Sequence, residues 1–376
     1  MYDVIIVGAR CAGSPLAMLL AKKGRKVLVV DRSTFPSDIM STHYIQPEGV
    51  KRLQEWGLYD RVMASNCPPI PSITFNLSGI PIVPPRDPSM PDAICPRRTV
   101  LDKILVDAAR AAGAEVREGF SVQEILIEDG TVIGLRGRNS DGTTVEERAR
   151  ITVGADGQHS IVARAVQARE YDTHPAASCG YYSYFSGVPL KDGCAEAYVG
   201  NDAGVLAFPT NDELTCVGAG GPHDIFHAYR ADIESTFYRL VERASPAFAD
   251  RLRAGTREER WIGTADTANF FRQPYGPGWA LCGDAGYHKD FVTGLGIADA
   301  FRDAEFLSEG LDAGLSGRAP RDEALAAYQK RRDETAKPMY DLTVQFAQFP
   351  SMEEMAANMA NAGQAATGAE SVAAEA

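Results

Sequence analysis

The first 31 residues constrain the fold more than any other part of the chain. Residues 2–7, YDVIIV, are apolar and β-branched, as in a strand that is buried on both faces of a parallel sheet. A glycine loop follows at once, then a helical stretch over 13–23 and a second apolar run, KVLVVD, over 26–31. A strand, a tight turn, a helix and a strand in this order predict a βαβ unit.

The loop of this unit is a variant of the G-x-G-x-x-G pattern that binds dinucleotides. Gly8 permits the tight turn and Gly13 permits close packing of helix and strand, whereas Arg10 occupies the place of the middle glycine. Two interpretations of Arg10 stay open: a cation that reaches the pyrophosphate, or part of a purely structural turn. Asp31 ends the second strand, where a carboxylate accepts hydrogen bonds from ribose hydroxyls, and we assign Arg32 to the same site. The unit alone does not separate NAD from FAD.

Composition excludes several classes of function. The net charge of -12 repels polyanions on average, so nucleic acid is not expected as a partner. Seven scattered cysteines without a CxxC pair indicate a reducing cytoplasm and no zinc site. No stretch approaches the ~20 apolar residues of a membrane span, so we expect a cytoplasmic protein without one.

Two later motifs resemble the further fingerprints of the FAD-dependent monooxygenase superfamily of the para-hydroxybenzoate hydroxylase fold. They are GADGQHSIVAR at 154–164 and GDAG at 283–286, in the family's order after the first loop. The resemblance implies that Asp284 binds the ribitol region of FAD and that Asp156 and Gly157 serve the pyrophosphate and the pyridine nucleotide. It also implies that Arg98, at the start of a helix over 98–113, contacts FAD.

Within that superfamily the chain resembles a subgroup of geranylgeranyl reductases, flavin halogenases and small tailoring hydroxylases. The run YHKDFVTGLG over 287–296 occupies the place of their glycine-rich loop, with Phe291 where a proline is common. The resemblance implies that N–H groups of the loop that holds Gly294 and Gly296 approach the N1–C2=O edge of the isoalloxazine, where negative charge accumulates on reduction.

These motifs and the remaining pattern predict an α/β fold: a Rossmann-like FAD-binding domain with an inserted antiparallel β-sheet substrate domain and C-terminal helices. Residues 175–220 alternate as in an antiparallel sheet, short strands are expected up to about residue 154, and two helical segments should follow the sheet. The expected pieces are an FAD-binding domain over 1–70, 95–170 and 265–315, a substrate domain over 71–94 and 171–264, a C-terminal helix over 316–350 and a flexible tail over 351–376. Met352, Met355 and Met359 have helical spacing and are expected as a packing or dimer stripe.

His43 and His288 are the candidate catalytic residues, because histidine titrates near neutrality. Each has an open alternative: His43 as a hydrogen-bonded loop residue, and His288 as a loop contact for FAD. Lys289 is expected to be solvated. The aromatic residues of the sheet are expected first as core, and second as the lining of a flat apolar substrate pocket. The pocket candidates are Tyr182, Tyr184, Phe208 and Phe271.

The resemblance implies an FAD-dependent monooxygenase of secondary metabolism. Such an enzyme is reduced by NADPH or NADH, forms a flavin C4a-hydroperoxide with O2, and hydroxylates or epoxidises a small aromatic molecule. The lack of a second dinucleotide motif agrees with transient nicotinamide binding and equally with a separate flavin reductase. The alternatives are a saturating reductase of the geranylgeranyl type, a two-component halogenase and a non-catalytic flavin-binding regulator. The halogenase signature WxWxIP is absent, and a monomer and a homodimer both stay open.

Overall fold

The computed structural model describes residues 1–77, 79–200, 202–350 and 354, so the predictions for the tail and the methionine stripe lie outside the described residues. The βαβ unit forms as expected, with β1 (Tyr2–Val7), α1 (Gly13–Lys22) and β2 (Val27–Val30), and the two strands pair in parallel. Gly24 ends α1 with a φ of +78°, which glycine adopts without strain.

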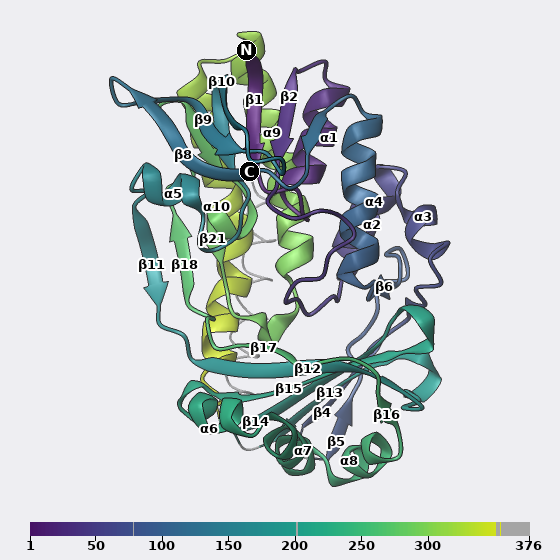
Figure 1. Cartoon of the computed structure of the whole chain (residues 1–376). Helices are drawn as coiled ribbons and strands as arrows, with labels where there is room; N and C mark the ends of the chain where they lie inside the picture. Colours follow the sequence, from purple (N-terminus) through teal and green to yellow (C-terminus); the bar gives the residue numbers. More distant parts are fainter. Residues whose placement is uncertain (78, 201, 351–353, 355–376) are drawn as a thin grey trace, which may run out of the picture.

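A mainly parallel sheet organises the first domain, in the order β19-β20-β10-β1-β2-β7, with β19 antiparallel to β20. Its other strands are β7 (Glu115–Arg117), β10 (Thr144–Gly154), β19 (Tyr275–Gly276) and β20 (Trp279–Leu281). Helices α1, α4 (Arg98–Ala111) and α9 (Gly296–Ser316) bury their apolar residues on one face (Figure 1). The other face packs against α5 (Ile161–Ala165) and the hairpin of β8 (Ser121–Glu128) and β9 (Thr131–Arg138).

The strands before residue 154 are longer than expected, because β10 serves two sheets. Its first half pairs antiparallel with β9 and its second half pairs parallel with β1. Five of the first seven residues of β10, TVEERAR, are polar or charged and precede the apolar run, so the sequence suggests several short strands where one 11-residue strand exists.

The inserted sheet is mainly antiparallel and has the order β16-β12-β15-β14-β13-β4-β5, with β17 also paired to β12. Its strands are β4 (Ile73–Leu77), β5 (Ile80–Ile82), β12 (Ser178–Ser186), β13 (Ala195–Gly200), β14 (Ala203–Pro209), β15 (Thr215–Pro222), β16 (Thr256–Arg257) and β17 (Ile262–Thr264). The predicted fold class is therefore confirmed.

Helices cover the face of the inserted sheet that points away from the first domain (Figure 1). Three are present where two were expected: α6 (Phe226–Ala231), α7 (Ile233–Ala244) and α8 (Pro246–Arg253). The chain breaks twice because the side chains of Asp232 and Ser245 each cap a new helix, accepting from the N–H groups of Ser235 and Phe248.

A small sheet and a long helix connect the two parts. The sheet has the order β11-β18-β21, from β11 (Glu170–His174), β18 (Asn269–Arg272) and β21 (Tyr287–His288), and it packs against α10 (Arg321–Phe346). The remaining elements beside the first domain are β3 (Pro69–Ile70), β6 (Ala93–Ile94), α2 (Pro47–Glu55) and α3 (Tyr59–Met63).

Candidate functional site

The first loop requires glycine at two positions, because of its backbone conformation and because neighbouring atoms leave no space for a side chain. Gly8 has a φ of +101°, and a Cβ there would lie 2.3 Å from the carbonyl oxygen of Ala155. A Cβ on Gly13 would lie 1.8 Å from the carbonyl oxygen of Gly8. Only glycine therefore fits at either position, and the loop touches the second motif directly.

The GD motif lies against the same loop. Gly283 has a φ of +59°, and a Cβ there would lie 2.8 Å from the Cβ of Ala12. The next residue, Asp284, is exposed, and its carboxylate makes no hydrogen bond within the described part of the chain. The folding chain thus brings together three motifs that are widely separated in the sequence; we call them the cofactor loops, residues 8–13, 154–157 and 283–286.

The carboxylate of Asp31 accepts hydrogen bonds from backbone N–H groups of the first glycine loop and of the segment after β2. Its Oδ2 accepts from the N–H of Ala9 and its Oδ1 from the N–H of Ser33, both at 2.8 Å. Each carboxylate oxygen keeps a second lone pair. The neighbouring Arg32 is exposed. The two residues lie at the end of the strand where a ribose was expected.

Arg10 does not extend outward. Its Nη1 donates to Oδ2 of the fully buried Asp102 at 2.5 Å, and its Nη2 donates to Oγ of Ser37 at 2.9 Å. The guanidinium also lies over the ring of Phe35, 5.2 Å from its centroid. Neither interpretation of Arg10 foresaw this inward ion pair, because Asp102 lies 92 residues further along the chain.

Arg98 shares the same carboxylate. Its Nε and Nη2 donate to Asp102 at 3.0 and 3.1 Å, while its Nη1 makes no hydrogen bond to the described residues. Burial is the largest single effect and opposes the charge of Arg98, but Asp102 and the other neighbouring groups, Asp284 among them, together outweigh burial and raise the pKa of the guanidinium above its usual value. Arg98 is therefore a fixed cation close to the GD motif.

The second motif forms a turn that Asp156 caps. The Oδ2 of Asp156 accepts from the N–H of Ile161 at 2.7 Å, whereas its buried Oδ1 has no hydrogen-bond partner in the described chain. Burial raises the pKa of Asp156. Gly157 has a φ of +83° and open space beyond its Cα. An unpaired buried oxygen is costly, so this carboxylate has capacity for one further donor.

Two arginines that the sequence reasoning missed, the buried Arg332 and the half-buried Arg272, support the GD motif. Arg332 of α10 donates from Nη1 to the carbonyl oxygen of Gly286 at 3.0 Å and from Nη2 to the hydroxyl of Tyr171 at 2.8 Å. Arg272 of β18 donates from Nη1 to the carbonyl oxygen of Ala285, also at 3.0 Å. Nothing in the local sequence distinguishes these arginines from solvated ones, because the carbonyl oxygens that they bind lie 46 and 13 residues away along the chain.

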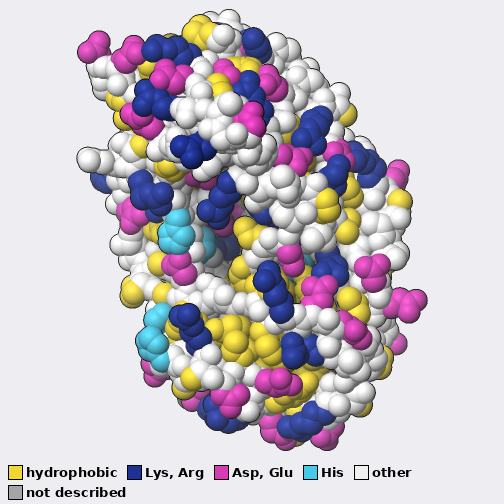
Figure 2. Space-filling view, viewed as in Figure 1, with side chains coloured by type: hydrophobic (Ala, Val, Ile, Leu, Met, Phe, Trp, Pro, Cys, Tyr) yellow, Lys and Arg dark blue, Asp and Glu magenta, His cyan; other side chains and the backbone are white. Residues whose placement is uncertain are grey.

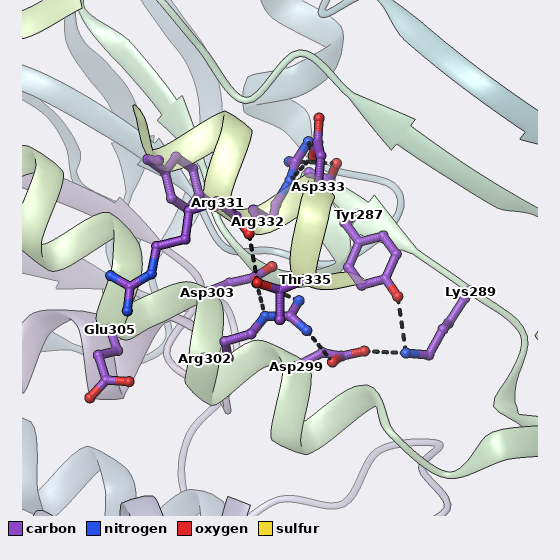
Figure 3. Close-up of polar contacts among 12 residues, drawn as sticks. Tyr287, Lys289, Asp299, Arg302, Asp303, Glu305, Arg331, Arg332, Asp333 and Thr335 are labelled. Atoms are coloured by element: carbon purple, nitrogen blue, oxygen red, sulfur yellow. Dashed lines mark hydrogen bonds and ion pairs between the residues drawn. The ribbon is translucent and has the colours of Figure 1, made fainter. Parts of the chain in front are cut away.

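Lys289 is buried, so the prediction of a solvated side chain is wrong. Its ammonium group contacts the carboxylate of Asp299 and donates to the hydroxyl of Tyr287 at 3.0 Å. Arg302 donates from Nη1 to the other oxygen of Asp299 at 2.6 Å, and Figure 3 shows these side chains pointing toward one another behind the start of α9. The loop before α9 folds back over the first turn of this helix, which removes Lys289 from water.

The glycine-rich loop ends at the N-terminus of α9. Gly294 has a φ of +62°, and Gly296 is exposed as the first residue of the 21-residue helix. The first N–H groups of a helix have no acceptor within it. His288 is half-buried; its Nδ1 lies 2.5 Å from the carbonyl oxygen of Ala268, so this nitrogen carries the proton. Its ring stacks on Phe270 at 5.6 Å.

His43 is fully buried and held from both sides. Its Nδ1 lies 2.8 Å from the carbonyl oxygen of Ser41, so Nδ1 carries the proton, and its Nε2 lies 2.7 Å from the hydroxyl of Tyr184 and accepts from it. Burial, and then the positive charge of Arg98, lower the pKa of His43 to about 3. The imidazole is neutral and hydrogen-bonded through both nitrogens. Of the two interpretations of His43, this agrees with the hydrogen-bonded loop residue.

The four aromatic candidates divide between two regions. Tyr182 and Tyr184 pack edge-on against His43, with ring centroids 5.3 and 5.6 Å from the imidazole, and Phe208 stacks on Tyr44 at 4.8 Å. These three side chains form what we call the inner face, the side of the inserted sheet that contacts residues 39–44 of the first domain. Phe271 instead packs with Tyr287 and Tyr340 against α10.

Figure 2 shows a recess in the middle of the molecule, between the first domain and the inserted sheet, with Lys and Arg side chains above it and hydrophobic side chains below it. The groups of the site fit FAD: a glycine cradle without space for Cβ atoms, a partly unpaired Arg98, an exposed Asp284 and open helix N–H groups. The arrangement matches the chemistry of a dinucleotide, with backbone and cations for phosphates and acids for hydroxyls.

The comparisons with known proteins agree with this geometry. The sequence model of the family described as FAD binding domain matches residues 1–343, and the chain belongs to this family. It is an FAD-dependent oxidoreductase of the FAD-dependent monooxygenase superfamily. Digeranylgeranylglycerophospholipid reductase of Methanosarcina acetivorans is 26% identical over 359 residues, which cover 92% of this chain and 83% of that protein.

Two solved structures share the fold. The myxobacterial chondrochloren halogenase CndH superposes with a TM-score of 0.85 at 24% identity, covering 97% of this chain and 90% of that chain. PqsL of Pseudomonas aeruginosa, described as a probable FAD-dependent monooxygenase, superposes with a TM-score of 0.79 at 20% identity, covering 95% of this chain and 99% of that chain. No helix of the described residues is long and apolar enough to cross a membrane.

Proposed function

We propose that the chain is a monooxygenase that uses NADPH or NADH and O2 to hydroxylate or epoxidise a small aromatic molecule. The inner face supports this proposal, because it is aromatic and dry where it meets the first domain. Tyr182, Tyr184 and Phe208 are 4%, 0% and 3% exposed, and His43 is fully buried beside them. Oxygen chemistry on a reduced flavin needs a site from which water is excluded.

The cofactor loops and the residues around them would divide the work of holding FAD. Asp31 and Arg32 would serve the adenosine ribose, Asp284 the ribitol, and Arg98 with the loop of Gly8 and Gly13 the pyrophosphate. The Oδ1 of Asp156, which has no hydrogen-bond partner among the described residues, would accept from the cofactor or the nicotinamide beside Gly157 once the turn gives access to it. The N–H groups after Gly294, from Gly296 onward, would face the ring. When bound, FAD supplies electron transfer and the activation of O2.

The two histidines would have different roles. A pKa of about 3 leaves His43 neutral, so it would act as a fixed acceptor that orients Tyr184 and closes the inner face. His288 carries its proton on Nδ1, and its Nε2 would accept a hydrogen bond from a group at the edge of the recess.

A saturating reductase is the second candidate function. The reductase of Methanosarcina acetivorans is similar over 92% of this chain, and a reduction inserts no oxygen. A reductase of this type would act on a long isoprenoid and need a long apolar lining, whereas the hydroxyls of Tyr182 and Tyr184 make the inner face partly polar.

The decisive experiment mixes FAD-loaded protein anaerobically with NADPH and then NADH, with a panel of phenolic and indolic ligands, and follows bleaching of the flavin band. We expect bleaching that accelerates with one ligand class, and an oxygenated product after air is admitted. Saturation of geranylgeraniol without O2 uptake would transfer the assignment to the reductase. Turnover only with externally reduced flavin would mean a partner reductase and would exclude direct use of nicotinamide.

A further inference from the structure

Arg10 stands where the dinucleotide motif has its middle glycine, and its side chain makes its contacts within the protein. It turns between α4 and the segment after β2, where it binds Asp102 at 2.5 Å and Ser37 at 2.9 Å and covers Phe35. Its side chain is 16% exposed. The Arg10 side chain therefore connects the first loop to α4 and to residues 33–37.

The carboxylate of Asp102 is the centre of this connection. It is fully buried and accepts from two guanidinium groups, Arg10 and Arg98, while the thiol of Cys11 lies 3.5 Å from its Oδ1. Two cations and one anion leave a net charge of +1 close to the expected pyrophosphate. With Arg98 alone, the buried pair would be neutral, and Asp102 would lose its shortest hydrogen bond.

We propose that Arg10 and Asp102 are positioning residues for FAD: Asp102 fixes Arg98 with its Nη1 toward the phosphates, and Arg10 supplies the second charge and holds residues 33–37 in place. The inference rests on the proposed role of Arg98 in the cofactor site. From the motif alone, one would expect a glycine at position 10 to favour FAD binding. Our proposal predicts the opposite: restoring the consensus glycine at position 10 should weaken FAD binding.

The test measures FAD binding to the apoprotein by quenching of flavin fluorescence, which needs no substrate. We expect Arg10→Gly to raise the Kd for FAD about tenfold, the loss expected for one charge-assisted hydrogen bond. Arg10→Lys should recover part of the affinity, since it keeps the charge without the fork. Asp102→Asn should weaken FAD binding about as much as Arg98→Ala does, because Arg98 loses the charge that holds it.

A matched control separates this effect from lost stability. Arg25 binds the buried Asp312 at 2.5 Å and is 19% exposed, much like Arg10, but its partner lies at the far end of α9 from Gly296. Arg10→Ala and Arg25→Ala remove equivalent ion pairs, and only the first should weaken FAD binding.

Three results would overturn the inference: equal or tighter FAD binding by Arg10→Gly, equal losses for Arg10→Ala and Arg25→Ala, or unchanged binding by Arg98→Ala. The proposed function fails separately. If the Arg10 variants weaken FAD binding as expected but the wild-type protein oxygenates no ligand, the monooxygenase proposal is refuted and the positioning role is supported.

Discussion

The cofactor loops and the inner face are built by different physical means. In and beside the cofactor loops, backbone geometry and buried ion pairs fix the positions: Gly8 and Gly13 have no space for a Cβ, and Asp102 binds two arginines. The inner face depends on aromatic packing and on hydrogen bonds from Tyr184 to His43 and from Tyr182 to the carbonyl oxygen of Ile39. Substitutions in the two regions should therefore have different effects. Those in the cofactor loops should cause loss of cofactor, and those at the inner face should alter substrate use or pH dependence.

The largest effect is expected in the first loop. Gly8→Ala places a methyl group 2.3 Å from the carbonyl oxygen of Ala155 at a φ of +101°, so we expect loss of FAD binding and a clear drop in Tm. Gly24→Ala is the matched control, because Gly24 also has a positive φ of +78° but open space around it. Thermal unfolding and flavin content measure both. Similar losses in the two variants would show that φ, not the close approach, constrains Gly8.

Asp284→Ala tests the cofactor side without touching the core. The side chain is exposed and makes no hydrogen bond among the described residues, so we expect an unchanged Tm of the apoprotein and flavin lost on gel filtration. Asp31→Ala should have a milder effect on FAD, together with some loss of stability, because its carboxylate binds Ala9 and Ser33. Normal flavin content in Asp284→Ala would refute its assignment to the ribitol region.

The pH dependence of stability tests the inner face. The folded pKa of His43 is about 3, below the ordinary value of 6.5, so the folded state binds fewer protons than the unfolded state between these values. The contribution of His43 is therefore complete above pH 6.5 and is lost as the pH falls toward 3, by at most about 1.4 kcal/mol per pH unit. Denaturant unfolding of His43→Gln should show a shallower acid loss than wild type. The exposed His223→Gln should follow wild type.

The smallest effect separates the aromatic candidates. Phe271→Leu should cost about 1 kcal/mol of stability, since Phe271 packs with Tyr287 and Tyr340 against α10. It should leave the KM for substrate unchanged, whereas Phe208→Leu should raise KM, because Phe208 belongs to the inner face. Denaturant unfolding and steady-state kinetics compare the two. A raised KM in Phe271→Leu would place this ring in the substrate site.

The sequence predicted more about the cofactor loops than about the inner face. Glycines in a tight turn and an acid at a strand end leave local signatures, so Gly8, Gly13 and Asp31 were predicted together with the βαβ unit that carries them. The prediction for Asp284 came instead from the resemblance of its GDAG motif to the superfamily. Alternation on β12 predicts only that one face is buried. It does not say what covers that face, which is why Tyr182 and Phe271 were grouped although different elements cover them.

The sequence by itself determined the α/β fold and the order of the three motifs, because these depend on local periodicity and on backbone conformations that few residues adopt. The family followed from the resemblance of those motifs to known ones. Only the tertiary structure decided where the charged side chains point. Arg10 meets Asp102 from 92 residues away, and His43 meets Tyr184 from 141. Burial changes the protonation and the partners of such groups, and burial is a property of the packed chain rather than of any segment.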